Sequence, residues 1–276
     1  MSWRELAFTV AILIIVLSGL IFVALPRTRV ELKKREGTAP DAEPFWTLIA
    51  LLSGGVAPIG LLLVSTSITM ARQPADMMAM LMSINSVMSS YMPFLILALL
   101  VLAIVLIFSY KSYPRLFNRA ITGLWVGAVA TIALDAIRYP IGVGLKTLPG
   151  DMPTMFGKFI FGTDDVTAGI LLVGYLYHFL NGADFGIVYT LIAGKARWYW
   201  GVVWGLIIEA LMMTTPPMLL MGVGPFGINT GAPWYFLTTL AAHIAFGTVL
   251  GLLAERFVKE EGTILEVLRP ALAAKS

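Results

Sequence analysis

Two histidines and one glutamate are the residues of this chain whose types and positions could do chemistry. His178, Glu209 and His243 each lie about 9 to 11 residues into a long apolar stretch, which is roughly 13–17 Å at 1.5 Å per helical residue. Two imidazoles and a carboxylate at one depth could ligate a transition metal, and two histidines on adjacent helices could bind a b-type haem. They could also form a structural hydrogen bond or a proton or ion relay. His178 and His243 are therefore candidate cofactor-binding residues, and all three are candidate metal ligands.

Three further ionisable residues lie within or at the ends of apolar stretches. Asp135 and Arg138 are three residues apart, a spacing at which a helix lets them pair with each other. Asp184 follows His178 by six residues, so it points to a different helix face. Because ionisable groups inside a membrane are costly, each of the three is a further candidate site residue.

Each histidine begins the same pattern, His-x3-Gly-x3-Gly. The glycines are Gly182 and Gly186 after His178, and Gly247 and Gly251 after His243. Positions four and eight residues apart share a helix face, and glycine there lets another backbone approach closely. The pattern predicts a duplicated hairpin with helix-packing seams, with the alternative that the histidines form a site.

Composition excludes most soluble classes. The chain has 276 residues, of which 58% are hydrophobic and 13% charged, with a mean hydropathy of +0.86. A soluble domain is about 25% charged. The net charge is only +3, and the basic residues do not gather into one stripe, which argues against nucleic-acid binding. The chain has no cysteine, which excludes disulfides, thiolate metal ligands and thiol nucleophiles.

Seven apolar stretches are long enough to cross a bilayer core of about 30 Å. The sequence therefore predicts an all-α, polytopic transmembrane bundle of seven spans. A Thr-Thr-Pro-Pro run at residues 214–217 is expected to break the sixth span. The spans run near Leu6–Leu25, Trp46–Ser65, Pro93–Tyr110, Ala120–Ile137, Thr167–Ala193, Tyr199–Leu220 and Trp234–Ala254.

The distribution of Lys and Arg predicts the orientation. The loops after spans 1, 3 and 5 and the C-terminal tail carry 14 of the 19 basic residues. Basic loops stay in the cytoplasm, so we expect an external N-terminus and a cytoplasmic C-terminus. The 14 are Arg27, Arg29, Lys33, Lys34, Arg35, Lys111, Arg115, Arg119, Lys195, Arg197, Arg256, Lys259, Arg269 and Lys275.

The chain divides into three expected parts. Residues 1–117 form a three-span N-terminal part with an external, Met-rich amphipathic helix near residues 76–90, lying in the interface plane. Residues 118–256 form the duplicated four-span part, and residues 257–276 a cytoplasmic tail. Apart from Met1, every methionine falls in the expected outer half. Methionine packs adaptable surfaces and also binds Cu(I).

The second half of the chain resembles a family of uncharacterised bacterial multi-span membrane proteins. The resemblance covers about residues 118–255 and rests on the His-x3-Gly hairpins, on Arg138-Tyr139-Pro140 and on the Met-Met run of span 6. The family pattern has Gly before its second histidine, where this chain has Ala242. The resemblance implies a fold of repeated hairpins and no particular activity.

The sequence favours a non-catalytic subunit or scaffold of a membrane complex, not an enzyme. Two alternatives stay open. One is a transporter of a small solute or a copper-like metal ion with a mid-membrane site near His178, Glu209 and His243; the other is a haem-b redox subunit. The expected partners are the lipid bilayer and other subunits of a membrane complex. The expected location is the bacterial cytoplasmic (inner) membrane.

Overall fold

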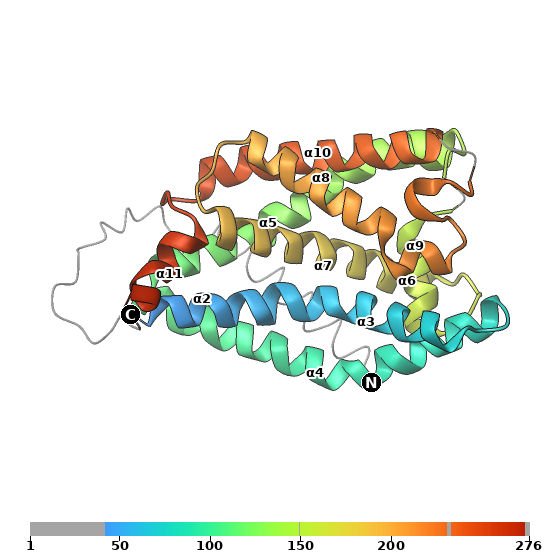
Figure 1. The fold of residues 1–276 in the computed structure, drawn as a ribbon, viewed down its shortest axis with the longest axis horizontal. Coiled ribbons are helices and arrows are strands. Elements are labelled where there is room, and N and C mark those ends of the chain that lie inside the picture. Colours follow the sequence, from blue (N-terminus) through green and yellow to red (C-terminus); the bar gives the residue numbers. More distant parts are fainter. Residues whose placement is uncertain (1–41, 149, 231–232, 274–276) are drawn as a thin grey trace.

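Long helices make up the molecule. The structure is a computed structural model, and it describes residues 42–148, 150–230 and 233–273. Within those residues every regular element is a helix, and Figure 1 shows the long helices lying side by side along the molecule. The expected all-helical fold is confirmed. The expected first span, Leu6–Leu25, lies outside the described residues.

Among the described residues, five helices are long and apolar enough to cross a membrane. They are Glu43–Arg72, Met77–Ser112, Pro114–Gly144, Ala168–Ala193 and Trp234–Phe257. A sixth apolar helix, Tyr199–Thr214, has only 16 residues and reaches about 24 Å. The structure therefore describes a helical bundle with five candidate membrane spans in the described residues, while the expected number of seven spans and the orientation of the termini are not confirmed.

The first described span is one continuous helix with a π-helical segment inside it. It consists of α2 (Glu43–Leu51), η1 (Leu52–Val56) and α3 (Ala57–Arg72). Pro58 lies in the first turn of α3, where its missing N–H removes one donor from the helical ladder. The expected span Trp46–Ser65 falls within this helix.

The expected interfacial helix near residues 76–90 is not separate. Asp76 caps a single helix, α4 (Met77–Ser112), by accepting a hydrogen bond from the Ala79 N–H, and the helix passes through Pro93. The amphipathic pattern predicts a helix that lies in the interface plane. Instead, Met80, Leu81, Ile84 and Met88 pack against aromatic residues of α6 in a protein core, so the apolar face is satisfied by protein contacts.

The second half supplies the remaining helices. The expected sixth span is broken as predicted, because Thr215 is extended between α8 and α9 and two prolines follow it. The elements are α5 (Pro114–Ile137), η2 (Arg138–Gly144), α6 (Met152–Phe161), α7 (Ala168–Ala193), α8 (Tyr199–Thr214), α9 (Pro216–Leu220), η3 (Pro225–Gly227), α10 (Trp234–Phe257) and α11 (Ile264–Ala273).

Helix α5 packs against α7 along a seam of glycines. A Cβ atom on Gly127 would overlap the carbonyl oxygen of Gly182, and one on Gly186 would overlap the carbonyl oxygen of Gly123. Such close approach of two backbones is possible only without side chains on either helix.

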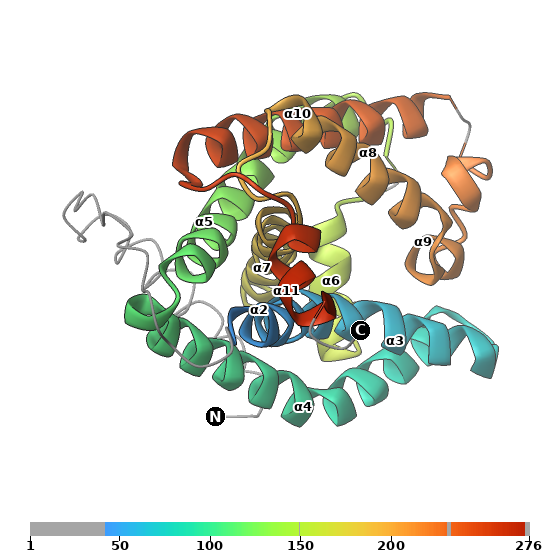
Figure 2. The same cartoon turned by 60° about the vertical axis from the view of Figure 1, so that its left-hand side comes forward.

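Helix α8 packs against α10 in the same way. A Cβ atom on Gly201 would overlap the carbonyl oxygen of Gly247, and one on Gly205 would overlap that of His243. Helix α10 also packs against α5, which joins the two pairs, as Figure 2 shows. The glycines predicted to form seams do so within the chain, each facing glycines or backbone on a neighbouring helix.

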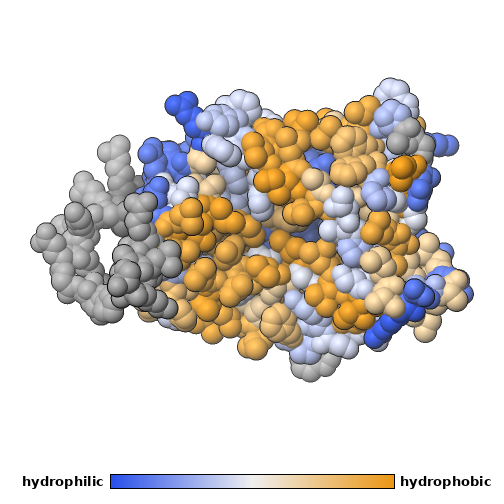
Figure 3. Space-filling model, in the orientation of Figure 1, coloured by the Kyte–Doolittle hydropathy of each residue, from blue (hydrophilic) through white to orange (hydrophobic). Residues whose placement is uncertain are grey.

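The outer surface fits a membrane environment. In each candidate span, about half of the residues in the most apolar 18-residue segment are buried in protein. Apolar side chains such as Ile104, Ile107 and Leu172 are more than half exposed. Figure 3 shows apolar residues over the middle of this face and hydrophilic ones toward the ends. Helices satisfy their own backbone hydrogen bonds, so lipid can cover such a surface.

Adding one methyl group to a seam glycine should destabilise the protein. We expect Gly182→Ala and Gly247→Ala to lower the free energy of unfolding by about 1–3 kcal/mol, because the new Cβ meets backbone or Thr131 that cannot yield. The measurement is unfolding of the purified protein in bicelles by titrated detergent.

Gly169→Ala is the matched control, because Gly169 lies on the same helix as Gly182 and a Cβ atom there would meet only Oγ1 of Thr167, at an ordinary contact distance of 3.9 Å. Removing glycine from a helix there should be neutral or stabilising by up to about 1 kcal/mol. Equal effects at all three positions would contradict the seam.

Candidate functional site

The first histidine is held by a carboxylate of the neighbouring helix. The Nε2 atom of His178, on α7, lies 3.1 Å from Oδ1 of Asp135, on α5. Arg138 donates to the same oxygen at 2.9 Å and lies 3.3 Å from Asp151 at the start of α6. The expected pairing of Asp135 with Arg138 is found, and Asp151 is a partner that the sequence analysis did not include.

The second histidine has its own carboxylate. The Nδ1 atom of His243, on α10, lies 2.7 Å from Oε2 of Glu209, on α8, and 2.9 Å from the carbonyl oxygen of Thr239. Because a carbonyl can only accept, we assign the ring proton to Nδ1. The Thr239 hydroxyl donates to Oε1 of Glu209 at 2.7 Å. Oε1 of this buried glutamate therefore accepts a hydrogen bond, whereas Oε2 lies against Nδ1 of His243 without a hydrogen bond among the described residues.

The two helix pairs follow one arrangement. In each, an acid on the first helix contacts a histidine on the second: Asp135 with His178, and Glu209 with His243. His178, Glu209 and His243 thus do not form one cluster. In the described ranges, no group of three or more His, Cys, Asp or Glu residues could hold a metal ion. The geometry favours two paired sites over the single metal site considered from the sequence.

A one-turn offset explains why the acids have different spacings from the glycines. Gly127 lies against Gly182, whereas Gly205 lies against His243. The second seam is therefore displaced by four residues along its second helix. Asp135 follows Gly127 by eight residues, but Glu209 follows Gly205 by only four. The acid stands four residues nearer to its seam glycine in the second pair, and the seam itself is displaced by four residues on the partner helix. In antiparallel helices these two displacements cancel. Each acid therefore reaches its histidine.

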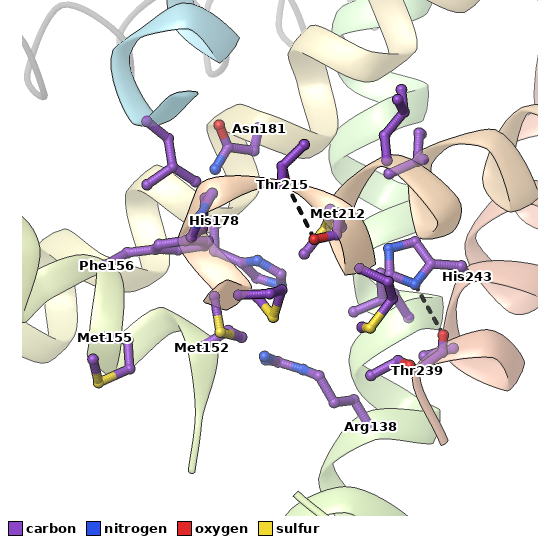
Figure 4. Close-up of a pocket in the computed structure, with 18 of the residues that line it drawn as sticks. Arg138, Met152, Met155, Phe156, His178, Asn181, Met212, Thr215, Thr239 and His243 are labelled. Atoms are coloured by element: carbon purple, nitrogen blue, oxygen red, sulfur yellow. Dashed lines mark hydrogen bonds between the residues drawn. The ribbon is translucent and has the colours of Figure 1, made fainter. Parts of the chain in front are cut away.

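Both histidines line a single cavity of about 340 Å³. In Figure 4, His178 and His243 lie on opposite sides of the view, and the Nε2 atom of His243 is turned toward the cavity. Arg138, Asn181 and Thr215 add polar groups, and the remaining wall is mainly apolar. Seven methionines also line it: Met77, Met152, Met155, Met212, Met213, Met218 and Met221.

Asp184 is placed apart from this cavity. It lies on α7 with His178 but does not belong to the cavity wall, and only 1% of its surface is exposed. The different helix face expected from the six-residue spacing accounts for this separation. Among the candidate residues, the structure therefore places His178, His243 and Arg138 in the cavity wall, with Asp135 and Glu209 in contact with the two histidines, and leaves Asp184 elsewhere in the bundle.

Separate pairs predict a specific pattern of energetic coupling. We expect Glu209→Ala to lower the free energy of unfolding by about 1–3 kcal/mol, because it removes the carboxylate that His243 and the Thr239 hydroxyl contact and leaves a gap in its place. Double-mutant cycles in bicelles should give a coupling of at least about 0.5 kcal/mol between Glu209 and His243, and between Asp135 and His178.

The cross pair Glu209 and His178 is the control, since the two share no contact in the described structure. Its coupling should stay below about 0.5 kcal/mol. A coupling between Glu209 and His178 as large as that between Glu209 and His243 would mean that one shared site exists.

Comparisons with protein-family models, curated proteins and solved structures give no match to this chain. The resemblance to bacterial multi-span proteins over residues 118–255 therefore stays a prediction.

Proposed function

We propose that this chain is an integral membrane protein that binds a small, mostly apolar molecule between its helices, as a solute carrier does. Of the three functions that the sequence left open, the cavity favours the solute-binding one over a purely supporting subunit. The observation that carries the proposal is that two histidines, each backed by its own carboxylate, line one cavity. A bundle that only packs has no need of such a space.

The size of the cavity favours an organic molecule. Pockets for small molecules measure about 300–1,000 Å³ and are mostly apolar with a few polar groups, and this one has about 340 Å³. A single metal ion would fill little of it. A b-type haem would need one ring nitrogen from each histidine as a ligand to its iron. The Nε2 atom of His178 already contacts Asp135, which weakens the haem alternative.

The polar groups of the wall suggest what the occupant carries. His178 and His243 stand on different helices, so an occupant with a hydrogen-bonding group at each end of an apolar body could contact both. The carboxylates orient the rings, as they do for histidines in other binding sites. Methionine side chains are flexible and polarisable, so the wall can adapt to the shape of the occupant.

A soft metal ion is the second candidate. Seven thioethers and two imidazoles line the same cavity, and such ligands select Cu(I) among the available metals. The absence of a three-residue cluster of His, Cys, Asp or Glu among the described residues does not bear on thioether ligands. The volume of the cavity still favours the organic molecule.

We further propose that the chain crosses the bacterial inner membrane seven times, with the N-terminus outside. The distribution of Lys and Arg supports this, with 14 of 19 on the side that holds the C-terminus. Residues 6–25 supply the first span in this proposal, and α8 with α9 supplies the sixth. The 118–256 part is proposed to be a duplicated hairpin.

Blocking the cavity should remove a bound molecule. We expect protein purified from its native membranes in nanodiscs to release one small molecule into organic solvent, detected by mass spectrometry. Met212→Trp should lower its amount at least tenfold, because Met212 lines the cavity between the histidines. Met82→Trp is the control, since Met82 is 60% exposed on α4 and outside the cavity.

The same samples distinguish the candidates. If the wild type retains copper and Met212→Trp loses it, the occupant is a soft metal ion and the proposal of an organic molecule is wrong. Identical extracts, without copper, from all three proteins would contradict both and favour the supporting subunit.

The proposed orientation has its own test. Reporter fusions after Lys111 and after Lys195 should read as cytoplasmic, and a fusion after Lys146 should read as external, because basic loops stay inside. The opposite activity at any of the three positions would overturn the proposed topology.

A further inference from the structure

Asp184 is a carboxyl group buried in the middle of the bundle. It lies nine residues before the end of α7, about 14 Å along the helix, and 1% of its surface is exposed. Within the described part of the chain, its Oδ2 atom has no hydrogen-bond partner. A carboxylate left in such a place costs many kcal/mol unless it is paired or neutralised.

The helices around α7 carry no charge beside this carboxyl. Residues 44–71 of α2–α3 and residues 120–134 of α5 contain no Asp, Glu, Lys, Arg or His. The ionisable groups elsewhere on the packed elements have their own contacts. Arg119 donates to carbonyls of residues 260–262, Arg138 and His178 contact Asp135, Lys158 pairs with Asp164, and Glu209 contacts His243.

Further titratable groups lie near the ends of the helices around Asp184 and on α7 itself. Glu43 and Arg72 stand at the ends of the first described span, and Glu266 lies on α11. Tyr177, seven residues earlier on α7, is the neighbour whose hydroxyl interacts electrostatically with the carboxyl. A neutral phenol supplies no positive charge, so no cation balances Asp184 among the described residues.

The neighbouring π-helical segment packs against the part of α7 that follows Asp184. A Cβ atom on Gly54 would meet Ile187, and one on Gly55 would meet Val188. These residues follow Asp184 by three and four positions and so share its side of α7. Segment η1 therefore packs one turn away from the carboxyl. Pro58 lies two residues after this segment and brings no N–H, so the helical ladder has one donor fewer there.

We propose that Asp184 is a proton-binding site inside the membrane: a side chain that is a neutral carboxylic acid in the folded protein at neutral pH and releases its proton reversibly. A neutral acid needs no counter-charge, which fits a buried position without a cation. Ionisable groups at this depth commonly mark proton pathways. The proposal does not depend on what occupies the cavity.

An apolar carbodiimide tests the protonation state. Dicyclohexylcarbodiimide adds to a protonated carboxyl in an apolar environment: the acid proton passes to a carbodiimide nitrogen, and the carboxyl oxygen bonds to the central carbon. Rearrangement then gives a stable N-acylurea with no leaving group. We expect labelling of the wild type in nanodiscs at neutral pH, located at Asp184 by peptide mass spectrometry.

Matched variants control this experiment. Asp184→Asn, an isostere of the neutral acid, should accumulate like the wild type and lose the label, while Glu209→Gln should keep the label at Asp184. Protein unfolded in detergent at acid pH shows that the reagent can reach the residue. Labelling of Asp184 only after unfolding would overturn the proposal.

Infrared spectroscopy supplies a readout that does not depend on reagent access. The wild type should show a carboxylic-acid C=O band at neutral pH that Asp184→Asn lacks, and raising the pH should convert it to a carboxylate band. Absence of the acid band would overturn the proposal. An acid band that persists at every pH at which the protein stays folded would also overturn it, since the proton would then be structural.

Discussion

Close contact between bare backbones at two helix seams is the constraint on which the rest of the structure depends. Helices α5 and α7 touch at Gly127 and Gly182, and α8 and α10 touch at Gly205 and His243. In a membrane the hydrophobic effect does not drive helices together, so association depends on van der Waals packing over surfaces that fit. Small residues four positions apart provide those surfaces, and a single methyl group at such a point leaves no room for the neighbouring carbonyl. The seams therefore set both the spacing and the register of the helices that carry the ionisable residues.

Register is what turns these seams into a site. Asp135 and Glu209 are placed beside His178 and His243 by where their helices touch. A shift of one turn along either seam, about 5.4 Å, would move each carboxylate out of hydrogen-bond reach of its histidine and leave both groups unpaired in an apolar interior. That penalty of several kcal/mol per unpaired group selects the native register. The same placement brings both histidines to the wall of one cavity. There, the second nitrogen of each ring is available to an occupant.

Much of the fold could be predicted from the sequence, because length and hydropathy are local properties. The long apolar helices, the break before Pro216 and the packing role of Gly182 and Gly247 all follow from local pattern. The expected interfacial helix is the first part of the longer helix α4, and its amphipathic pattern does not tell whether lipid or protein covers the apolar face. Part of that face packs with residues of α3, α6 and α7, and α6 and α7 are distant in sequence. The separation of His178, which pairs with Asp135, from Glu209 and His243 was missed for a related reason. Depth along each helix can be counted from the sequence, but which helices are neighbours, and with which offset, depends on the seams.

The central claim is that each hairpin holds its own histidine–carboxylate pair, and solid-state NMR can measure it without any substitution. The chain has only two histidines, so protein labelled with ¹⁵N in its histidine rings gives signals from His178 and His243 alone. Rotational-echo dephasing by ¹³C placed in side-chain carboxyl groups reports which ring lies next to which acid. The account predicts that ¹³C in glutamate dephases the ring of His243 and leaves His178 unchanged, and that ¹³C in aspartate does the reverse. Dephasing of both rings by labelled glutamate, or of neither ring by either label, would contradict it.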